Sequence, residues 1–311
     1  MCFQTRIGGW RRASGSGSRI AMLPKTIASF FLFSAASLAG VLSARCAATG
    51  IIIVGDIQYQ PIAAAAADVE STLKVPLNVF STAQVKGKLR ALVRRENAGL
   101  VVALGREALE ETLQLPPSIS VVFGLVIAPP KTSRPNTTGV YLATPVREYV
   151  NIAKKYLPAI NKIAILGSPD MINILDSNAE LQGVAYRVSS CSEIVDTINR
   201  MHASDALLLL PDTALLTAGV MDQLFLFSFR KRIPLLGVSE GSVKNGALLA
   251  LVFDSASVGR QIGEKVLEAQ GGAAPPSAPR KFNLYINANT AMKMGIIIPE
   301  EMIKTAKNIY R

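Results

Sequence analysis

The amino-acid sequence predicts an α/β fold of two lobes, each built on a doubly wound parallel sheet. Short apolar runs such as GIIIVG (50–55), LVVAL (100–104) and ALLLL (206–210) have the composition of strands buried on both faces. Stretches with the apolar spacing of amphipathic helices separate these runs. A chain of 311 residues is also long enough for two domains of ordinary size.

The first half is expected to hold three strand-and-helix units in succession. Units of this kind build a doubly wound sheet with right-handed crossovers. A loop is expected over 128–138, because this stretch contains three prolines. The expected strands are 50–55, 100–104 and 120–123, and the expected helices are 62–73, 84–95 and one that begins after Gly105.

The second half repeats this plan, although no sequence repeat is visible. The helix-like run within 286–299 contains Met292 and Met294, which we expect in the core. The expected strands are 162–166, 183–188, 206–210, 233–237 and one within 246–254, and the expected helices are 146–156, 192–201, 218–231 and 257–268.

Residues 1–48 have the pattern of a secretory signal peptide. Lys25 precedes sixteen uncharged residues (27–42), and small residues follow up to Ala48, after which we expect cleavage. A membrane anchor is disfavoured because sixteen residues are short for a bilayer core of ~30 Å. Met22 is an alternative true start. Lipid attachment at Cys46 is also disfavoured, because Arg45 stands where a small residue is needed.

The charge and the cysteines exclude several classes of function. The net charge is +11, but residues 1–48 contain six basic and no acidic residues, which leaves +5 spread along the remainder. This distribution argues against a nucleic-acid-binding protein. The three cysteines and the single histidine, His202, lack the spacing of a zinc site.

No motif points to catalysis. The sequence contains no GxSxG, P-loop or HExxH, and the first strand is not followed by the glycine pattern of dinucleotide-binding proteins. His202, which we expect at the surface, has no evident nucleophile partner. We therefore expect neither an enzyme nor a cofactor.

Several segments resemble the substrate-binding proteins of ABC transporters, in the subfamily called tryptophan/tyrosine-type. The resemblance covers about residues 98–311, is strongest after Ala206, and includes ALGREAL (103–109), VVFGLVIAPP (121–130), NTTGVYLATP (136–145) and KKYLPAINKIAILGSP (154–169). It implies the type 1 fold of periplasmic binding proteins, with three hinge crossings near 138–141, 251–254 and 281–284. The implied lobes are 49–140 plus 253–283, and 141–252 plus 284–311.

The same resemblance implies a monomer in the periplasm that closes its lobes around a small-molecule ligand and presents it to a membrane permease. The alternative is a ligand-sensing or partner-binding module of the same fold without a role in transport. This sequence departs from the family where ligand binds: Arg106 stands in place of a small hydroxyl residue, and Ala128-Pro129 replaces Asp-Pro. The family's ligands are therefore not transferred to this chain.

Ligands of open α/β sheets bind beyond the carboxyl ends of the strands. Arg106, at a turn before a helix, is expected to bind a carboxylate, or alternatively to pair with Glu107 or Glu110. Asp212 is expected to accept an ammonium group or, alternatively, to cap the next helix. Tyr59 is expected to stack on a ligand or to cover the core edge, and Phe123 to border the ligand or to lie in the core. An aromatic or branched amino acid is the first ligand suggested. The full set of expected ligand-binding residues is Asp56, Tyr59, Gly105, Arg106, Phe123, Ser168, Asp212, Ser239 and Glu240.

Overall fold

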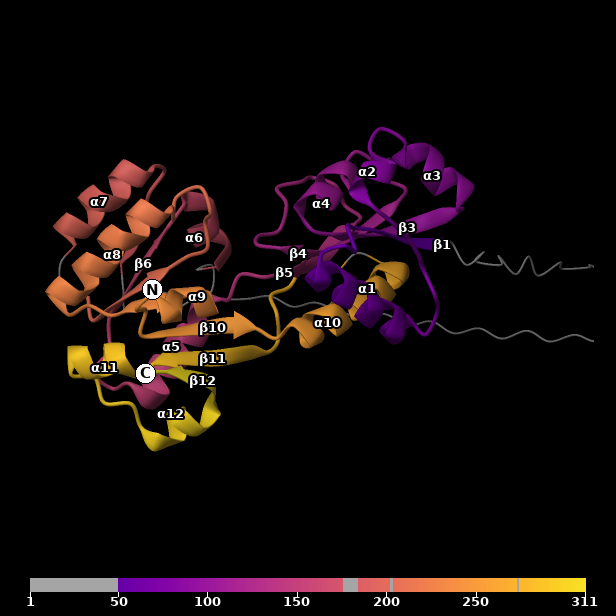
Figure 1. The fold of residues 1–311 in the computed structure, drawn as a ribbon. Helices are drawn as coiled ribbons and strands as arrows, with labels where there is room; N and C mark the ends of the chain where they lie inside the picture. The colour runs from indigo at the N-terminus through magenta and orange to yellow at the C-terminus, as the bar shows by residue number, and fades with distance from the viewer. Residues whose placement is uncertain (1–49, 176–183, 202–203, 273) are drawn as a thin grey trace, which may run out of the picture. The chain divides into compact units, whose positions relative to one another are not determined.

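The computed structural model describes residues 50–175, 184–201, 204–272 and 274–311. The expected signal peptide and His202 lie outside these residues. The described strands form two separate sheets, of five and seven strands, and each sheet is covered by its own helices (Figure 1). This is the α/β class that the sequence predicts.

The first sheet is entirely parallel, and its strand order is 2-1-3-4-5. Its central strands consist almost wholly of buried Val, Ile, Leu and Ala, as a parallel sheet covered on both faces requires. The strands are β1 (Gly50–Val54), β2 (Asn78–Phe80), β3 (Ala98–Leu104), β4 (Ser120–Val126) and β5 (Thr137–Tyr141).

Helices cover both faces of this sheet, and alternate residues of each strand face opposite layers. Ile53 packs with the layer of α1 and α10, whereas Ile52 packs with the layer of α2, α3 and α4. Figure 1 shows α1 and α10 side by side, and small residues allow their approach: a Cβ placed on Gly259 would lie 2.3 Å from Oδ2 of Asp68. The helices are α1 (Gln60–Leu73), α2 (Thr82–Val85), α3 (Leu89–Arg95), α4 (Arg106–Thr112) and α10 (Ser255–Gly271).

The second sheet contains the same arrangement with two strands added. Its order is β12-β11-β10-β9-β8-β6-β7, so that β6 to β10 repeat the order 2-1-3-4-5. The added β11 is antiparallel to β10 and parallel to β12. The strands are β6 (Ile163–Gly167), β7 (Ala185–Arg187), β8 (Ala206–Leu209), β9 (Leu235–Gly237), β10 (Leu249–Phe253), β11 (Phe282–Asn287) and β12 (Ala306–Tyr310).

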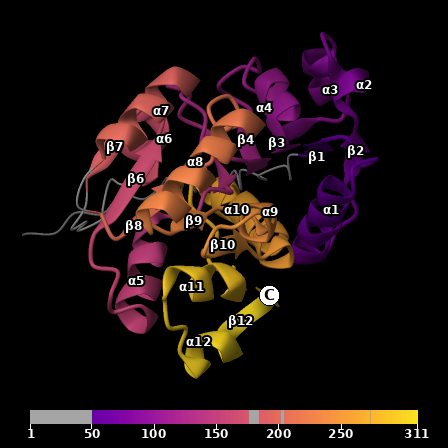
Figure 2. The ribbon, with the colours of Figure 1, turned by 60° about the vertical axis from the view of Figure 1, so that its left-hand side comes forward.

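Helices also cover both faces of the second sheet. One core layer packs α5, α6, α11 and α12 against the strands, and the opposite layer contains α7 and α8, which lie side by side in Figure 2. The short α9 packs on β10 and β11. The helices are α5 (Val146–Tyr156), α6 (Pro169–Leu175), α7 (Cys191–Arg200), α8 (Ala218–Lys231), α9 (Glu240–Lys244), α11 (Ala288–Met294) and α12 (Glu300–Thr305).

The chain passes from one sheet to the other between β5 and α5, between β10 and α10, and between α10 and β11. At the last two of these passages, the backbone N–H of Asp254 donates to the carbonyl of Lys281 at 3.0 Å. The residue boundaries of the two lobes stay a prediction.

The structure corrects three expectations about local structure. The helix expected over 84–95 is interrupted, because Gly87 adopts a φ of 69° between α2 and α3. The loop expected over 128–138 ends in a further strand, β5, and the short strands β2, β11 and β12 were not expected. Met294 is buried as expected, but Met292 is 73% exposed because it lies on the outer side of α11.

Within the described residues, no helix combines the length and the apolar composition needed to cross a membrane.

Candidate functional site

The strand order of the first sheet defines a switch point between β1 and β3. On one side of it the chain continues to β2, and on the other side to β4, so the loops after β1 and β3 diverge and leave a crevice at their carboxyl ends. Asp56 follows β1 at this edge, and Gly105 and Arg106 follow β3. The structure therefore brings these predicted site residues to one sheet edge.

Asp56 and Tyr59 belong to the loop between β1 and α1. Oδ1 of Asp56 accepts a hydrogen bond from the backbone N–H of Thr82 at 2.9 Å, which ties the loop to the start of α2. The carbonyl of Asp56 accepts from the N–H of Tyr59 at 2.9 Å. Tyr59 is 59% exposed, so a ligand can reach its side chain.

Gly105 and Arg106 form the turn from β3 into α4. Gly105 has a φ of 95°, which favours glycine, and its N–H donates to the carbonyl of Gly124 at 2.9 Å. Nε of Arg106 lies 2.9 Å from Oε1 of Glu110, and the arginine side chain is 86% exposed. Hydrogen bonding to Glu110 raises the pKa of Arg106. The ion pair with Glu110, which was the alternative for Arg106, is thus present. Contact between Arg106 and a ligand stays a prediction.

Phe123 differs from the other predicted residues because its ring is fully buried. It lies in the core layer between the sheet and α2 to α4, and a Cβ on Gly139 of the neighbouring strand would lie 2.6 Å from its Cγ. Phe123 therefore takes the core position that was its alternative, and its contact with a ligand stays a prediction.

Apolar side chains that sequence reasoning did not single out lie near this edge. Ile57 is 53% exposed in the loop after β1, and Ile127 is 40% exposed directly after β4. Between Phe123 and Val126 the pairing of β4 with β5 shifts register, and Leu125 takes a left-handed φ of 57°. Such a backbone costs about 1–2 kcal/mol for a residue other than glycine. An apolar residue directly after a strand end was the available sequence signal.

The second sheet has its own switch point, between β6 and β8. Ser168 follows β6 and Asp212 lies just beyond β8, so both reach this edge. Oδ1 of Asp212 accepts hydrogen bonds from the backbone N–H groups of Ala214 at 3.0 Å and Leu215 at 3.2 Å. Asp212 thus caps a turn, which is close to its alternative role, while its Oδ2 has no hydrogen-bond partner among the described residues.

Ser239 and Glu240 lie at the start of α9, after β9. The hydroxyl of Ser239 accepts from the N–H of Ser242 at 3.1 Å and caps the helix. Oε1 of Glu240 lies 2.9 Å from Nζ of Lys244 and accepts a hydrogen bond from the hydroxyl of Tyr310. The hydrogen bonds from Tyr310 and Lys244 lower the pKa of Glu240. Both residues therefore have partners within the chain.

Tyr149 of α5 supports the same edge from inside the core, and sequence reasoning missed it. Its hydroxyl donates to the carbonyl of Gly237 at 2.8 Å and lies 3.4 Å from the carbonyl of Leu251. The hydroxyl of Thr144 also donates to Leu251, at 3.0 Å. Burial raises the pKa of Tyr149 well above its usual value. Tyr149 thus joins α5 to the end of β9, shortly before Ser239, and to the middle of β10.

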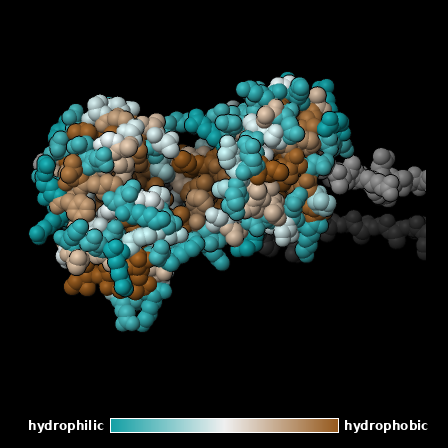
Figure 3. Space-filling model, in the orientation of Figure 1, coloured by the Kyte–Doolittle hydropathy of each residue, from teal (hydrophilic) through white to brown (hydrophobic). Residues whose placement is uncertain are grey.

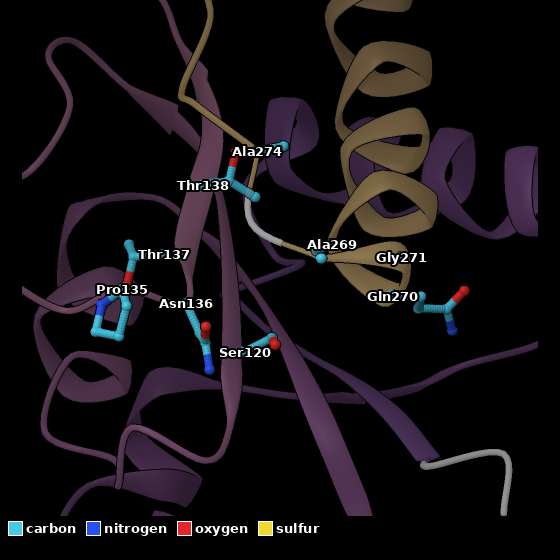
Figure 4. Close-up of a pocket in the computed structure, with 10 residues that line it drawn as sticks. Ser120, Pro135, Asn136, Thr137, Thr138, Ala269, Gln270, Gly271 and Ala274 are labelled. Atoms are coloured by element: carbon cyan, nitrogen blue, oxygen red, sulfur yellow. The ribbon is translucent and has the colours of Figure 1, made fainter. Parts of the chain in front are cut away.

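Two surface pockets lie away from the predicted residues. Figure 4 shows one of about 340 Å³, where Ser120 and Asn136, at the starts of β4 and β5, face the end of α10. It therefore lies at the edge opposite the strand ends. The other, of about 330 Å³, is bordered by α5, β10, β11 and Thr305 of α12. Neither pocket is lined by a predicted site residue. Among the described residues, no three His, Cys, Asp or Glu side chains gather as metal ligands would.

Comparison of the sequence with known protein families finds one family that matches most of the chain. The sequence pattern of the ABC transporter substrate binding protein family matches residues 82–310. The uncharacterised protein RP367 of Rickettsia prowazekii (strain Madrid E) is 33% identical over 79 residues, which are 24% of this chain and 26% of that protein. The match thus spans about a quarter of this curated relative.

Solved structures share the fold. The ABC domain from Streptococcus pneumoniae, in complex with L-Trp, is 17% identical with a TM-score of 0.53, and the similarity covers 84% of this chain and 99% of that one. The ligand-free, open form of CD0873 from Clostridium difficile, a substrate binding protein with adhesive properties, is 15% identical with a TM-score of 0.58, with the same coverage. At these identities the likeness establishes the fold alone.

Proposed function

Because the chain belongs to the family of ABC transporter substrate-binding proteins, whose members bind solutes and are not enzymes, we propose that it is the solute-binding component of an ABC-type uptake system. Its partner in this role is a membrane permease. We place the protein in the periplasm as a monomer, exported through the signal peptide predicted at 1–48.

The observation that carries the proposal is the repeated strand order. Both sheets have the order 2-1-3-4-5, and the switch-point edges carry Asp56 and Arg106 in the first sheet and Ser168 and Asp212 in the second. We propose that one small ligand is held between these two edges. Closure of the lobes around it then shifts the hinge equilibrium to a form that the permease recognises.

The side chains at these edges favour an amino acid with an apolar or aromatic side chain. Tyr59, Ile57 and Ile127 offer exposed apolar surface, Arg106 offers a guanidinium for the carboxylate, and Oδ2 of Asp212 is open to the ammonium group. The exposed pair of Arg106 with Glu110 contributes little to stability, so a ligand carboxylate replaces Glu110 at low cost. The complex of the Streptococcus pneumoniae protein with L-Trp also supports this class.

A ligand-sensing or partner-binding role without transport is the second candidate. Two observations favour it: Arg106 and Glu240 already have partners in their own chain, and neither surface pocket is lined by a predicted site residue. In this role a membrane sensor takes the place of the permease.

A thermal-shift screen against amino acids, nucleosides, small acids and sugars tests the solute-binding proposal. Residues 46–311 form one compact unit that contains both sheets, so this fragment is the sample. A ligand at 1,000 times its Kd adds about 4 kcal/mol of stability, a shift of several degrees in Tm. Stabilisation by one amino-acid class supports the proposal, and an unchanged Tm across the panel favours the partner-binding role.

A further inference from the structure

Three apolar side chains are exposed on α11, on α12 and on the segment between these two helices. Ile297 is 86% exposed, Met292 is 73% exposed and Ile303 is 41% exposed. We call these three residues the apolar knob. Figure 3 shows a hydrophobic surface over α11 and the segment that leads to α12, surrounded by hydrophilic side chains.

The local packing explains why these residues face outward. Met294 of α11 and Met302 of α12 are buried, and Ile296 and Ile298 pack against the same core. The core positions of this segment are therefore already filled. Ile297, between two inward-facing isoleucines, points to solvent. Single exposed apolar residues are ordinary, but a continuous apolar patch such as the one in Figure 3 marks an interaction surface.

The charges beside the knob are mainly positive. Lys293 follows Met292 and Lys304 follows Ile303 in the sequence. The two acidic residues of this segment are paired, Glu300 with Lys304 at 2.7 Å and Glu301 with Lys155 at 3.0 Å. Lys293 forms no ion pair among the described residues, whereas Lys307 lies near Glu240 of α9 and lowers the pKa of that carboxyl. A partner of this surface must therefore accept apolar side chains and carry negative charge.

We propose that the apolar knob docks on the surface of an anionic lipid bilayer. Ile297 and Met292 enter the boundary between headgroups and acyl chains, while Lys293 attracts the lipid phosphates. A second copy of this chain fits less well, because a two-fold contact places the knob and its lysines against the same surface of the other copy. Membrane docking of this kind is separate from solute binding and does not require a ligand.

Co-sedimentation with vesicles tests the proposal. Residues 46–311 are used, because the apolar segment at 27–42 would bind vesicles by itself. Vesicles of equal phosphatidylglycerol and phosphatidylcholine are compared with vesicles of phosphatidylcholine alone. We expect at least tenfold stronger partition to the anionic vesicles, and this preference decreases as salt is added.

Matched variants separate the knob from non-specific adsorption. The double variant Met292→Asp/Ile297→Asp is expected to lose at least tenfold in partition. Leu267→Asp, which places a charge on a 51% exposed leucine of α10, is expected to leave partition unchanged. Lys293→Gln is expected to reduce both the partition to anionic vesicles and the salt dependence of that partition. The altered side chains are exposed, and circular dichroism verifies that each variant is folded.

Three outcomes overturn the proposal: absence of partition by the wild type, equal partition to both kinds of vesicle, or equal partition by the knob variant and the wild type. Sedimentation analysis without vesicles tests whether a second copy of the chain binds the apolar knob instead of a membrane. A concentration-dependent dimer that Ile297→Asp abolishes would assign the knob to a second copy of the chain and contradict the lipid proposal.

Discussion

The guanidinium of Arg106 is held by the carboxylate of Glu110, one helical turn along α4, with 2.9 Å between Nε and Oε1. This pair keeps the arginine at the carboxyl end of β3, where the proposed ligand carboxylate lies. It also makes Glu110 a competitor of the ligand for the same guanidinium. The structure shows Arg106 paired with Glu110, and its contact with a ligand carboxylate stays a prediction.

We predict that substitutions of Arg106 and Glu110 have different effects on ligand affinity. Arg106→Ala removes the carboxylate's partner and is expected to weaken binding of an amino acid at least tenfold. Glu110→Gln removes the competitor, and affinity is expected to remain or to increase. Calorimetric titration measures both. Arg95→Ala, which breaks another arginine–glutamate pair at the surface of the same lobe, is the control and is expected to leave ligand affinity unchanged. Equal affinities of Arg106→Ala and the wild type would remove Arg106 from the site.

Gly139 is predicted to be essential for the packing of β5 on β4. A Cβ at this position would lie 2.1 Å from the carbonyl oxygen of Phe123 and 2.6 Å from its ring, so Gly139→Ala forces the strands apart. We expect a loss of about 3 kcal/mol in the free energy of unfolding, measured by urea denaturation. Gly219→Ala is the matched control, because no atom lies within 4 Å of a Cβ there, and it is expected to be neutral or stabilising.

Tyr149 is predicted to stabilise the folded protein through a buried hydrogen bond. Tyr149→Phe leaves the carbonyl of Gly237 without this donor. The free energy of unfolding is expected to decrease by about 1–2 kcal/mol. Because Ser239 follows this carbonyl closely, ligand affinity is also expected to fall. Tyr156→Phe, which removes a hydroxyl 3.5 Å from Oε1 of Glu301, is the control and is expected to retain the affinity.

The raised pKa of Tyr149 leads to a predicted pH dependence of stability. Burial raises the pKa of Tyr149 in the folded protein, while an unfolded tyrosine titrates near pH 10. Above that pH the unfolded chain releases a proton that the folded chain retains. The contribution of Tyr149 is therefore complete below about pH 10 and is lost as pH rises further. Urea denaturation from pH 9 to 11 is expected to show a steeper loss for the wild type than for Tyr149→Phe, and parallel curves would contradict this.

Tyr310 is predicted to control the ionisation of Glu240. The hydroxyl of Tyr310 is the main cause of the lowered pKa of Glu240, with Lys244 second. Tyr310→Phe is expected to raise the pKa of Glu240 toward its usual range, as measured by NMR titration of the carboxyl carbon. Asp68, whose pKa is raised by burial and is not influenced by Tyr310, is the internal reference, and an unchanged pKa of Glu240 in the variant would contradict the prediction.

Much of the fold follows from local pattern. The observed bounds of α5 and α8 equal those expected from apolar spacing, and the continuous apolar runs of β1, β3, β4, β6 and β8 are all strands. Edge strands escaped notice because they are short and carry polar residues, as in Asn78–Phe80 and Ala306–Tyr310. A helix break at Gly87 depends on one backbone angle that the spacing of apolar residues does not contain.

The sequence predicted where the candidate residues lie on the strands but not the contacts that they make, and their binding of a ligand stays a prediction. The strand-end rule places Asp56, Arg106, Ser168 and Asp212 at the switch-point edges, because parallel strands end together. The hydrogen bonds of Tyr149 join residues about ninety positions apart, which no local pattern records. Likewise, the exposure of Met292 depends on which side of α11 faces the core, and a seven-residue helix gives little periodicity to decide it.

The central claim is that one ligand touches both switch-point edges. Calorimetric titration of a ligand from the thermal-shift screen, with one variant at each edge, tests it most directly. Tyr59→Ala in the first sheet and Asp212→Asn in the second are each expected to weaken binding at least tenfold, while both variants remain folded. A loss confined to one of the two variants, or to neither, would contradict a ligand held between the two edges.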